Sequence, residues 1–273
     1  MQPSVSKALL LVALLFVPAA AYADMDARAV AEKISVDLAH MHKQAETILL
    51  QTSANPIFND FLTAPDPIKK RAAKDAVDQI MLSVSQKYHA SEICLIGAGG
   101  PELARVDEGK IAQTLDPNEV GNEFFGPAMA QAPKTVYIVP PYISHDAGKW
   151  VVAYATPIAI SGHTKAILHY EYSLEDYQIP VRQELYSHFH VVLVSADGLV
   201  LADNRSTIPV ALRGAETRPE AYFKKFTMQG SDLDGIKNKL RGGIGRVGPN
   251  DKSVSVAWRT VPAGMTLIVA QDK

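Results

Sequence analysis

His169 and Glu171 are the residues whose types and spacing first indicate ligand chemistry in this sequence. They lie two positions apart in an alternating segment, so on a β-strand they would share one face of a sheet with Ile167. Carboxylates are seldom buried without a partner. An imidazole and a carboxylate beside an apolar residue therefore either face solvent or belong to a pocket, and the sequence alone leaves both alternatives open.

Aromatic side chains are concentrated in the same part of the chain. They are Phe124, Phe125, Tyr137, Tyr142, Trp150, Tyr154, Tyr170 and Tyr172. Aromatic walls with a few polar groups are typical of small-molecule pockets, and aromatic faces beside a carboxylate suit a cationic ligand. The alternative is that these side chains form the core of a sheet.

No assembled catalytic motif accompanies these residues. The sequence lacks a His-Glu-x-x-His zinc helix, a Gly-x-Ser-x-Gly nucleophile elbow and a phosphate-binding loop. The pairs His40/His42 and His188/His190 have no clear third ligand, and Cys94, the only cysteine, lies in an apolar run. We therefore predict surface histidines, an inert buried thiol, no enzyme activity, no cofactor and no metal site.

The charge balance limits the partners. The 273 residues carry 27 basic and 29 acidic side chains, for a net charge of −2. A nucleic-acid-binding protein needs a basic face, and electrostatic docking on anionic lipid needs a basic cluster. The sequence therefore predicts neither nucleic acid nor a lipid surface as a partner.

The first 23 residues have the organisation of a signal peptide. Lys7 precedes the apolar run Leu9–Val17, and Ala21-Tyr22-Ala23 provides a small-residue cleavage site. The run is shorter than the roughly 20 residues that a membrane span needs. We expect cleavage after Ala23, release into the periplasm and no membrane-spanning segment in the mature chain.

The remaining sequence predicts an α+β protein with two antiparallel sheets and flanking helices. A helix at 24–52 carries an apolar stripe that either packs on its own domain or forms a coiled coil. The other expected helical segments are 68–88, 116–129 and 173–187. The expected strands are 92–97, 102–107, 135–140, 149–158, 165–172, 190–195, 199–202, 253–261 and 265–270. We predict a domain at 53–178 and a smaller second domain at 179–273.

This order of elements resembles the double Cache domain, an extracellular sensor module of bacterial chemoreceptors, histidine kinases and diguanylate cyclases. The segments that carry the resemblance are Glu123–Phe125, Tyr137–Tyr142, Gly148–Val152, Ala155–Ile158 and Lys165–Glu171, with weaker similarity at Val194–Gly198 and Trp258–Pro262. The resemblance implies a long N-terminal helix followed by two tandem PAS-like domains. It also implies that a ligand would lie in the first of them.

The resemblance further bears on the kind of ligand. A subset of these modules binds α-amino acids through an Arg-x-Trp-Tyr-x-x-Ala segment, followed by a Tyr and an Asp. Here Asn122 stands in place of the Arg, whereas Tyr142 and Glu171 fall at the later two positions. The guanidinium fork that would bind a carboxylate is therefore missing. An amine, or another ligand without a simple carboxylate, fits this pattern better.

Together these observations predict a free-standing periplasmic protein that binds a small organic ligand. It would relay a signal through a partner, such as a membrane sensor or a transporter. The predicted pocket walls are Phe124, Phe125, Tyr142 and Trp150, and the predicted polar contacts are Asn122, Tyr137, His169 and Glu171. The alternative is a structural protein that forms a homodimer through its N-terminal helix, and a periplasmic enzyme comes third.

Overall fold

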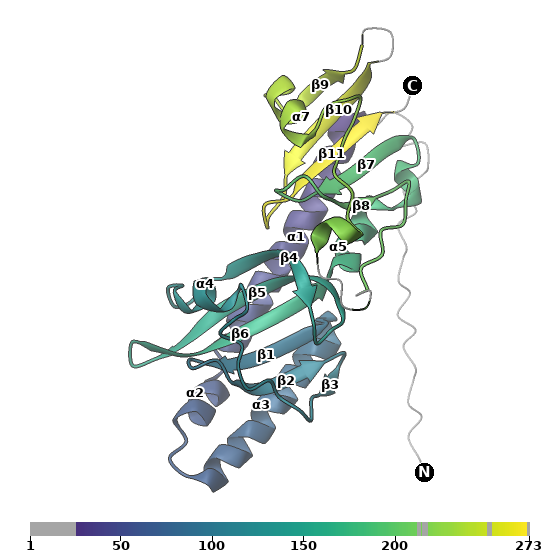
Figure 1. The fold of residues 1–273 in the computed structure, drawn as a ribbon. Helices are drawn as coiled ribbons and strands as arrows, with labels where there is room; N and C mark the ends of the chain where they lie inside the picture. Colours follow the sequence, from purple (N-terminus) through teal and green to yellow (C-terminus); the bar gives the residue numbers. More distant parts are fainter. Residues whose placement is uncertain (1–25, 212–213, 215–217, 250–252, 272–273) are drawn as a thin grey trace, which may run out of the picture.

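The computed structural model describes residues 26–211, 214, 218–249 and 253–271 (Figure 1). The expected signal peptide and its cleavage site lie outside these residues.

Three helices open the described chain. They are α1 (Ala27–Ser53), α2 (Pro56–Thr63) and α3 (Pro67–Tyr88). Each is preceded by a side chain that accepts a backbone hydrogen bond from its first turn, with Asp26, Asn55 and Asp66 in this role. Prolines at the first positions of α2 and α3 have the backbone angle that a helix start requires.

The first sheet is antiparallel and has six strands in the order β3-β2-β1-β6-β5-β4. The strands are β1 (Glu92–Gly97), β2 (Glu102–Asp107), β3 (Lys110–Ile111), β4 (Tyr137–Ser144), β5 (Lys149–Ile160) and β6 (His163–Ser173). Between β3 and β4, the expectation of a helix over 116–129 was wrong, because only α4 (Phe125–Met129) is helical. The side chains of Asp116 and Asn118 accept hydrogen bonds from backbone N–H groups two residues ahead, which favours turns over helix.

The second sheet repeats this topology. Its order is β8-β7-β11-β10-β9, which matches β2-β1-β6-β5-β4 strand for strand. Its strands are β7 (Phe189–Val194), β8 (Val200–Asp203), β9 (Ile244–Val247), β10 (Val254–Thr260) and β11 (Thr266–Gln271). The helices of this part are α5 (Leu174–Val181), the 3₁₀ turn Glu184–Tyr186, α6 (Pro219–Tyr222) and α7 (Leu233–Lys239). The predicted α+β architecture with two antiparallel sheets is therefore confirmed.

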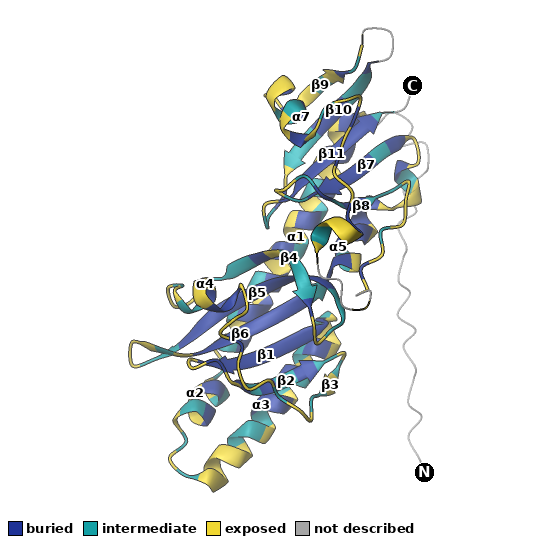
Figure 2. Ribbon diagram, viewed as in Figure 1, coloured by how far each residue is buried: buried dark blue, intermediate teal, exposed yellow. Residues whose placement is uncertain are grey.

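Helix α1 runs along both sheets (Figure 1) and packs against β10 and β11 as well as β5 and β6. Its apolar stripe is buried within the chain, with Ile34 and Leu38 fully covered. Figure 2 shows this dark, buried interior along the central strands of both sheets. Among the described helices, none is long and apolar enough to cross a bilayer.

Candidate functional site

The two faces of the first sheet differ in chemistry. Ile93, Leu168 and Tyr170 lie on the face that packs against the N-terminal helices. Cys94 and Ile167 belong to a separate cluster on the opposite face. The alternation expected for β6 is therefore correct, and it places His169 and Glu171 on this second face, where 1% and 3% of their surfaces are exposed.

A cavity of about 710 Å³ lies over this second face. Strands β1, β4 and β6 contribute residues to it, and the segment between β3 and α4 supplies others. Asp197 and Pro219, from the part of the chain that follows α5, also line the cavity, so it extends to the junction of the two sheets. Of the two alternatives for His169 and Glu171, the structure has the pocket and not the solvent-exposed surface.

The cavity is strongly acidic. Its lining includes seven carboxylates, from Glu92, Asp116, Glu119, Glu123, Asp146, Glu171 and Asp197. Among the described residues that line it, there is no lysine or arginine. The nearby Arg105 guanidinium is already paired, with Asp146 at 2.9 Å and Glu102 at 3.4 Å. The cavity therefore favours a positively charged occupant over a carboxylate.

Glu171 lies at the centre of a hydrogen-bonded group. The Tyr142 hydroxyl donates to Glu171, and its oxygen lies 3.2 Å from Nε2 of His169. The Phe124 ring stacks on the His169 ring, with centroids 4.1 Å apart and planes 14° from parallel. Four of the eight predicted site residues are therefore brought together at one point of the cavity.

Burial raises the pKa of several of these carboxyl groups. The pKa of Glu171 rises to about 7, because burial and the charges of Asp146 and Glu119 outweigh its hydrogen bonds from Tyr142 and Ser144. The pKa of Glu119 also rises to about 7, through burial and the neighbouring carboxylates Glu102 and Asp116. Such shifts mean that a bound cation would stabilise the ionised form of these groups.

The remaining predicted residues occupy different places. Asn122 lines the cavity and donates a side-chain hydrogen bond to Glu119. Trp150 lies at the end of the cavity nearest the second sheet, and the centroids of the Trp150 and Phe223 rings are 4.7 Å apart. Phe125 and Tyr137 do not line the cavity but belong to the apolar cluster beneath it.

Sequence reasoning missed several polar residues of this site. Glu92, Glu102 and Glu119 are each buried, with 6% or less of their surfaces exposed. Glu92 pairs with Glu171 across β1 and β6, and Cys94 pairs with His169. The only signal for this in the sequence is the Glu-x-Cys spacing within a strand, which places both side chains on one face but does not identify the partner strand.

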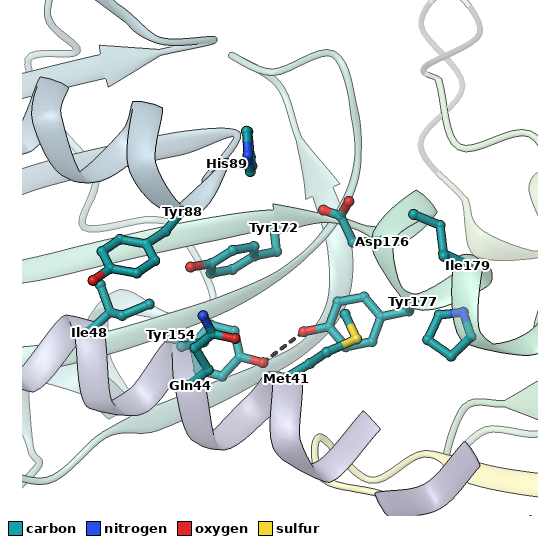
Figure 3. A pocket seen from close by; sticks show the side chains of 12 residues that line it. Met41, Gln44, Ile48, Tyr88, His89, Tyr154, Tyr172, Asp176, Tyr177 and Ile179 are labelled. Carbon is teal, nitrogen blue, oxygen red and sulfur yellow. Dashed lines mark hydrogen bonds between the residues drawn. The ribbon is translucent and has the colours of Figure 1, made fainter. Parts of the chain in front are cut away.

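A second cavity, of about 290 Å³, lies between the first sheet and helices α1 and α5 (Figure 3). Tyr88, Tyr154, Tyr172 and Tyr177 line it, with Asp176 and Gln44 as polar groups. The Tyr154 hydroxyl is already hydrogen-bonded to the Tyr177 hydroxyl at 2.7 Å and to His42. The polar groups of this smaller cavity are thus partly satisfied by one another.

The long helix and the two topologically matched sheets define the fold of Cache-type sensor domains. The extracellular domain of a histidine kinase, vpHK1S-Z8, superposes with a TM-score of 0.67 at 14% identity, covering 89% of this chain and 88% of that one. The ligand-binding domain of the Campylobacter jejuni chemoreceptor Tlp3, in complex with 4-methylisoleucine, gives a TM-score of 0.56 at 14% identity, with 89% and 92% covered.

The sensor domain of the Vibrio cholerae histidine kinase DctB gives a TM-score of 0.56, also at 14% identity, with 89% of this chain and 95% of that chain covered. No protein-family profile matches the sequence, and no curated protein sequence matches it. The shared feature is therefore the fold, and the ligand has to be inferred from the site itself.

Proposed function

We propose that this protein is a periplasmic sensory binding protein whose first Cache-type domain, at 53–178, binds a small organic cation, such as an amine without a carboxylate group. The single observation that carries the proposal is the acidic cavity, with seven lining carboxylates and, among its described lining residues, no lysine or arginine. Buried charges need partners of opposite sign. Arg105 pairs with Asp146, whereas the described lining residues include no lysine or arginine that could pair with the buried Glu119 and Glu171.

The proposed ligand would place its ammonium group beside Glu171 and Glu119. Phe124 and Tyr142, whose ring centroids lie 6.2 Å apart, would form aromatic walls beside it. Aromatic faces attract cations through their quadrupole, most strongly where water is excluded. A plain α-amino acid would bring a carboxylate close to buried acidic groups with no arginine to receive it.

The relay of a signal requires a partner, such as a membrane sensor or a transporter that distinguishes the liganded conformation. The cavity reaches Asp197 and Pro219 beyond α5, so an occupant would contact both parts of the chain. Closure between these parts is the conformational change that such a partner would read.

The alternative of a homodimer without a ligand has less support. Ile34 and Leu38, which would form its coiled-coil seam, are fully buried against the sheets of the same chain. Sedimentation analysis of the wild-type protein tests this point, because a stable dimer that forms without any ligand would favour the alternative.

The test is a thermal-denaturation screen of residues 24–273 against amines, α-amino acids, organic acids and sugars. A ligand at a hundred times its dissociation constant adds about 2.7 kcal/mol to the free energy of unfolding. We expect amines to give the largest shift, and we expect Glu171→Gln and Phe124→Ala to abolish it. Glu184→Gln, an exposed position outside the cavity, is the matched control and should keep the shift.

Two results would contradict the proposal. One is stabilisation by α-amino acids or organic acids in preference to amines. The other is an amine-dependent shift of equal size in wild type and Glu171→Gln.

A further inference from the structure

Four side chains that can bind metals form a compact block on the floor of the acidic cavity. In the pairing of β1 with β6, Glu92 lies opposite Glu171 and Cys94 lies opposite His169. Residues two apart on a strand share a face, so all four project from the same face of the sheet. All four are at least 97% buried.

Three of them converge closely. A carboxylate oxygen of Glu92, the Cys94 sulfur and a ring nitrogen of His169 all lie within 4.8 Å of one another. Such separations suit ligands that share one ion at metal–ligand distances of about 2.0–2.3 Å.

The hydrogen bonds around His169 favour one tautomer when Glu171 is ionised. The single Tyr142 hydroxyl proton is then directed at Glu171, and Nε2 of His169 is the donor in its 3.2 Å contact with the Tyr142 oxygen. Nδ1 is then left with its lone pair, and this buried atom has no hydrogen-bond partner. Histidines that bind metals have this arrangement, with the other ring N–H held by a neighbouring group.

The other two groups are also incompletely satisfied. The Cys94 sulfur lies 2.9 Å from Oε1 of Glu92 and 3.2 Å from Oε1 of Glu102, although a thiol has one proton to donate. Oε2 of Glu92 is buried and has no partner. A bound cation would relieve each of these conflicts.

We propose that Glu92, Cys94 and His169 bind one divalent transition-metal ion, with Zn²⁺ as the ion that suits a thiolate, an imidazole and a carboxylate. Binding releases the thiol proton to solvent and forms a metal–sulfur bond. Three protein ligands leave one tetrahedral position for a water molecule or a ligand group in the cavity. This proposal departs from the sequence-based expectation that Cys94 is inert and that the chain has no metal site.

The metal site lies in the same cavity as the organic cation but does not depend on it. Glu119, Asn122 and Glu123 line the same cavity and take no part in the metal site. The two proposals can therefore fail separately.

The test uses residues 24–273, stripped of metal with a chelator and titrated with Co²⁺. We expect one Co²⁺ per chain, with a near-ultraviolet thiolate-to-cobalt charge-transfer band that one equivalent of Zn²⁺ removes. Cys94→Ser should abolish the band. Loss of a hydrogen bond to a metal ligand typically weakens metal binding by roughly 10- to 100-fold. His169→Gln removes the ligand itself, so it should weaken Co²⁺ binding by more than this. His163→Gln, exposed at the start of the same strand, is the control and should bind Co²⁺ normally.

The wild-type spectrum alone can overturn the proposal. Absence of Co²⁺ binding, or binding without the thiolate band, would contradict it whatever the variants do. Preferential binding of Ca²⁺ that survives Cys94→Ser would also contradict it, because the carboxylates alone would then hold the ion. A thermal shift by an amine in the metal-free protein would leave the proposed function standing in each of these cases.

Discussion

In the six-stranded sheet, the central strands β1 and β6 place Cys94 opposite His169, whereas in the five-stranded sheet the equivalent strands β7 and β11 place Val192 opposite Ile268. The order of the five-stranded sheet matches five of the six strands of the first sheet, and both pairs lie on the face that points away from the cluster containing helix α1. One pair is polar and lies on the floor of a cavity. The other belongs to an apolar cluster together with Ile236 of α7.

The comparison distinguishes side chains that stabilise the fold from side chains that would bind a ligand. Val192 and Ile268 stabilise the second sheet by removing apolar surface from water. The corresponding face of the first sheet buries four carboxylates, from Glu92, Glu102, Glu119 and Glu171. Buried charges without full compensation lower stability. We therefore attribute the polar version of this face to the proposed ligand site.

The largest expected effect on stability comes from placing a carboxylate, like those buried at the first sheet, in the apolar cluster of the second sheet. Ile268 is fully buried, so Ile268→Glu should lower the free energy of unfolding by more than about 4 kcal/mol, because it places an unpaired carboxylate in an apolar cluster. Ile268→Leu, which keeps the volume, should lower it by less than about 1.5 kcal/mol. Urea denaturation measures both, and a well-tolerated glutamate would mean that this face also contains a polar site.

The next effect concerns the opposite face of the first sheet. The expectation that His42 is a surface histidine was wrong, because the residue is buried on α1 against the rings of Tyr154 and Tyr177. Burial lowers its pKa to about 4. Glu46 lies on the same helix, and its negative charge raises the pKa of Tyr154. Between pH 6.5 and 4 the unfolded chain therefore binds a proton at His42 that the folded chain does not, so stability falls as the pH falls.

Wild type should lose up to about 3 kcal/mol through His42 over this interval. His42→Gln should remove that part of the loss, and His40→Gln, exposed two residues away, should not. The difference in unfolding free energy between pH 7 and pH 4 measures this. Equal pH dependence in wild type and His42→Gln would contradict the assignment.

The smallest effect tests whether the acidic floor opposes stability. Glu171→Met should raise the free energy of unfolding of the ligand-free, metal-free protein by about 1–3 kcal/mol, because it replaces a buried carboxylate by an apolar side chain of similar size. The same variant should lose all response to amines. Glu184→Met, on an exposed position, should stay within about 0.5 kcal/mol of wild type. A loss of stability in Glu171→Met would mean that this carboxylate is fully compensated in the folded chain.

The sequence was sufficient for features that depend on local periodicity. The alternation of β6 placed His169 and Glu171 on one face and Leu168 on the other, as the structure has them. The alternating pattern of helices and strands also predicted two sheets, because each strand is bounded by turn residues.

The sequence was insufficient for features that depend on pairing between distant segments. Cys94 and His169 are 75 positions apart, and nothing local specifies that β1 pairs with β6 in the register that joins them. Glu119 lies in a segment whose polar composition suggested a helix, whereas backbone N–H groups that donate to the side chains of Asp116 and Asn118 hold this segment in turns. The carboxylates of the pocket could be recognised as a group only after these pairings were known.

The most direct test of the central claim is a crystal structure of residues 24–273 grown with the amine that gives the largest thermal shift. The account predicts the ammonium group within hydrogen-bonding distance of Glu171, beside the rings of Phe124 and Tyr142. Density for the amine in the tyrosine-lined cavity of Figure 3, or against the second sheet, would contradict it.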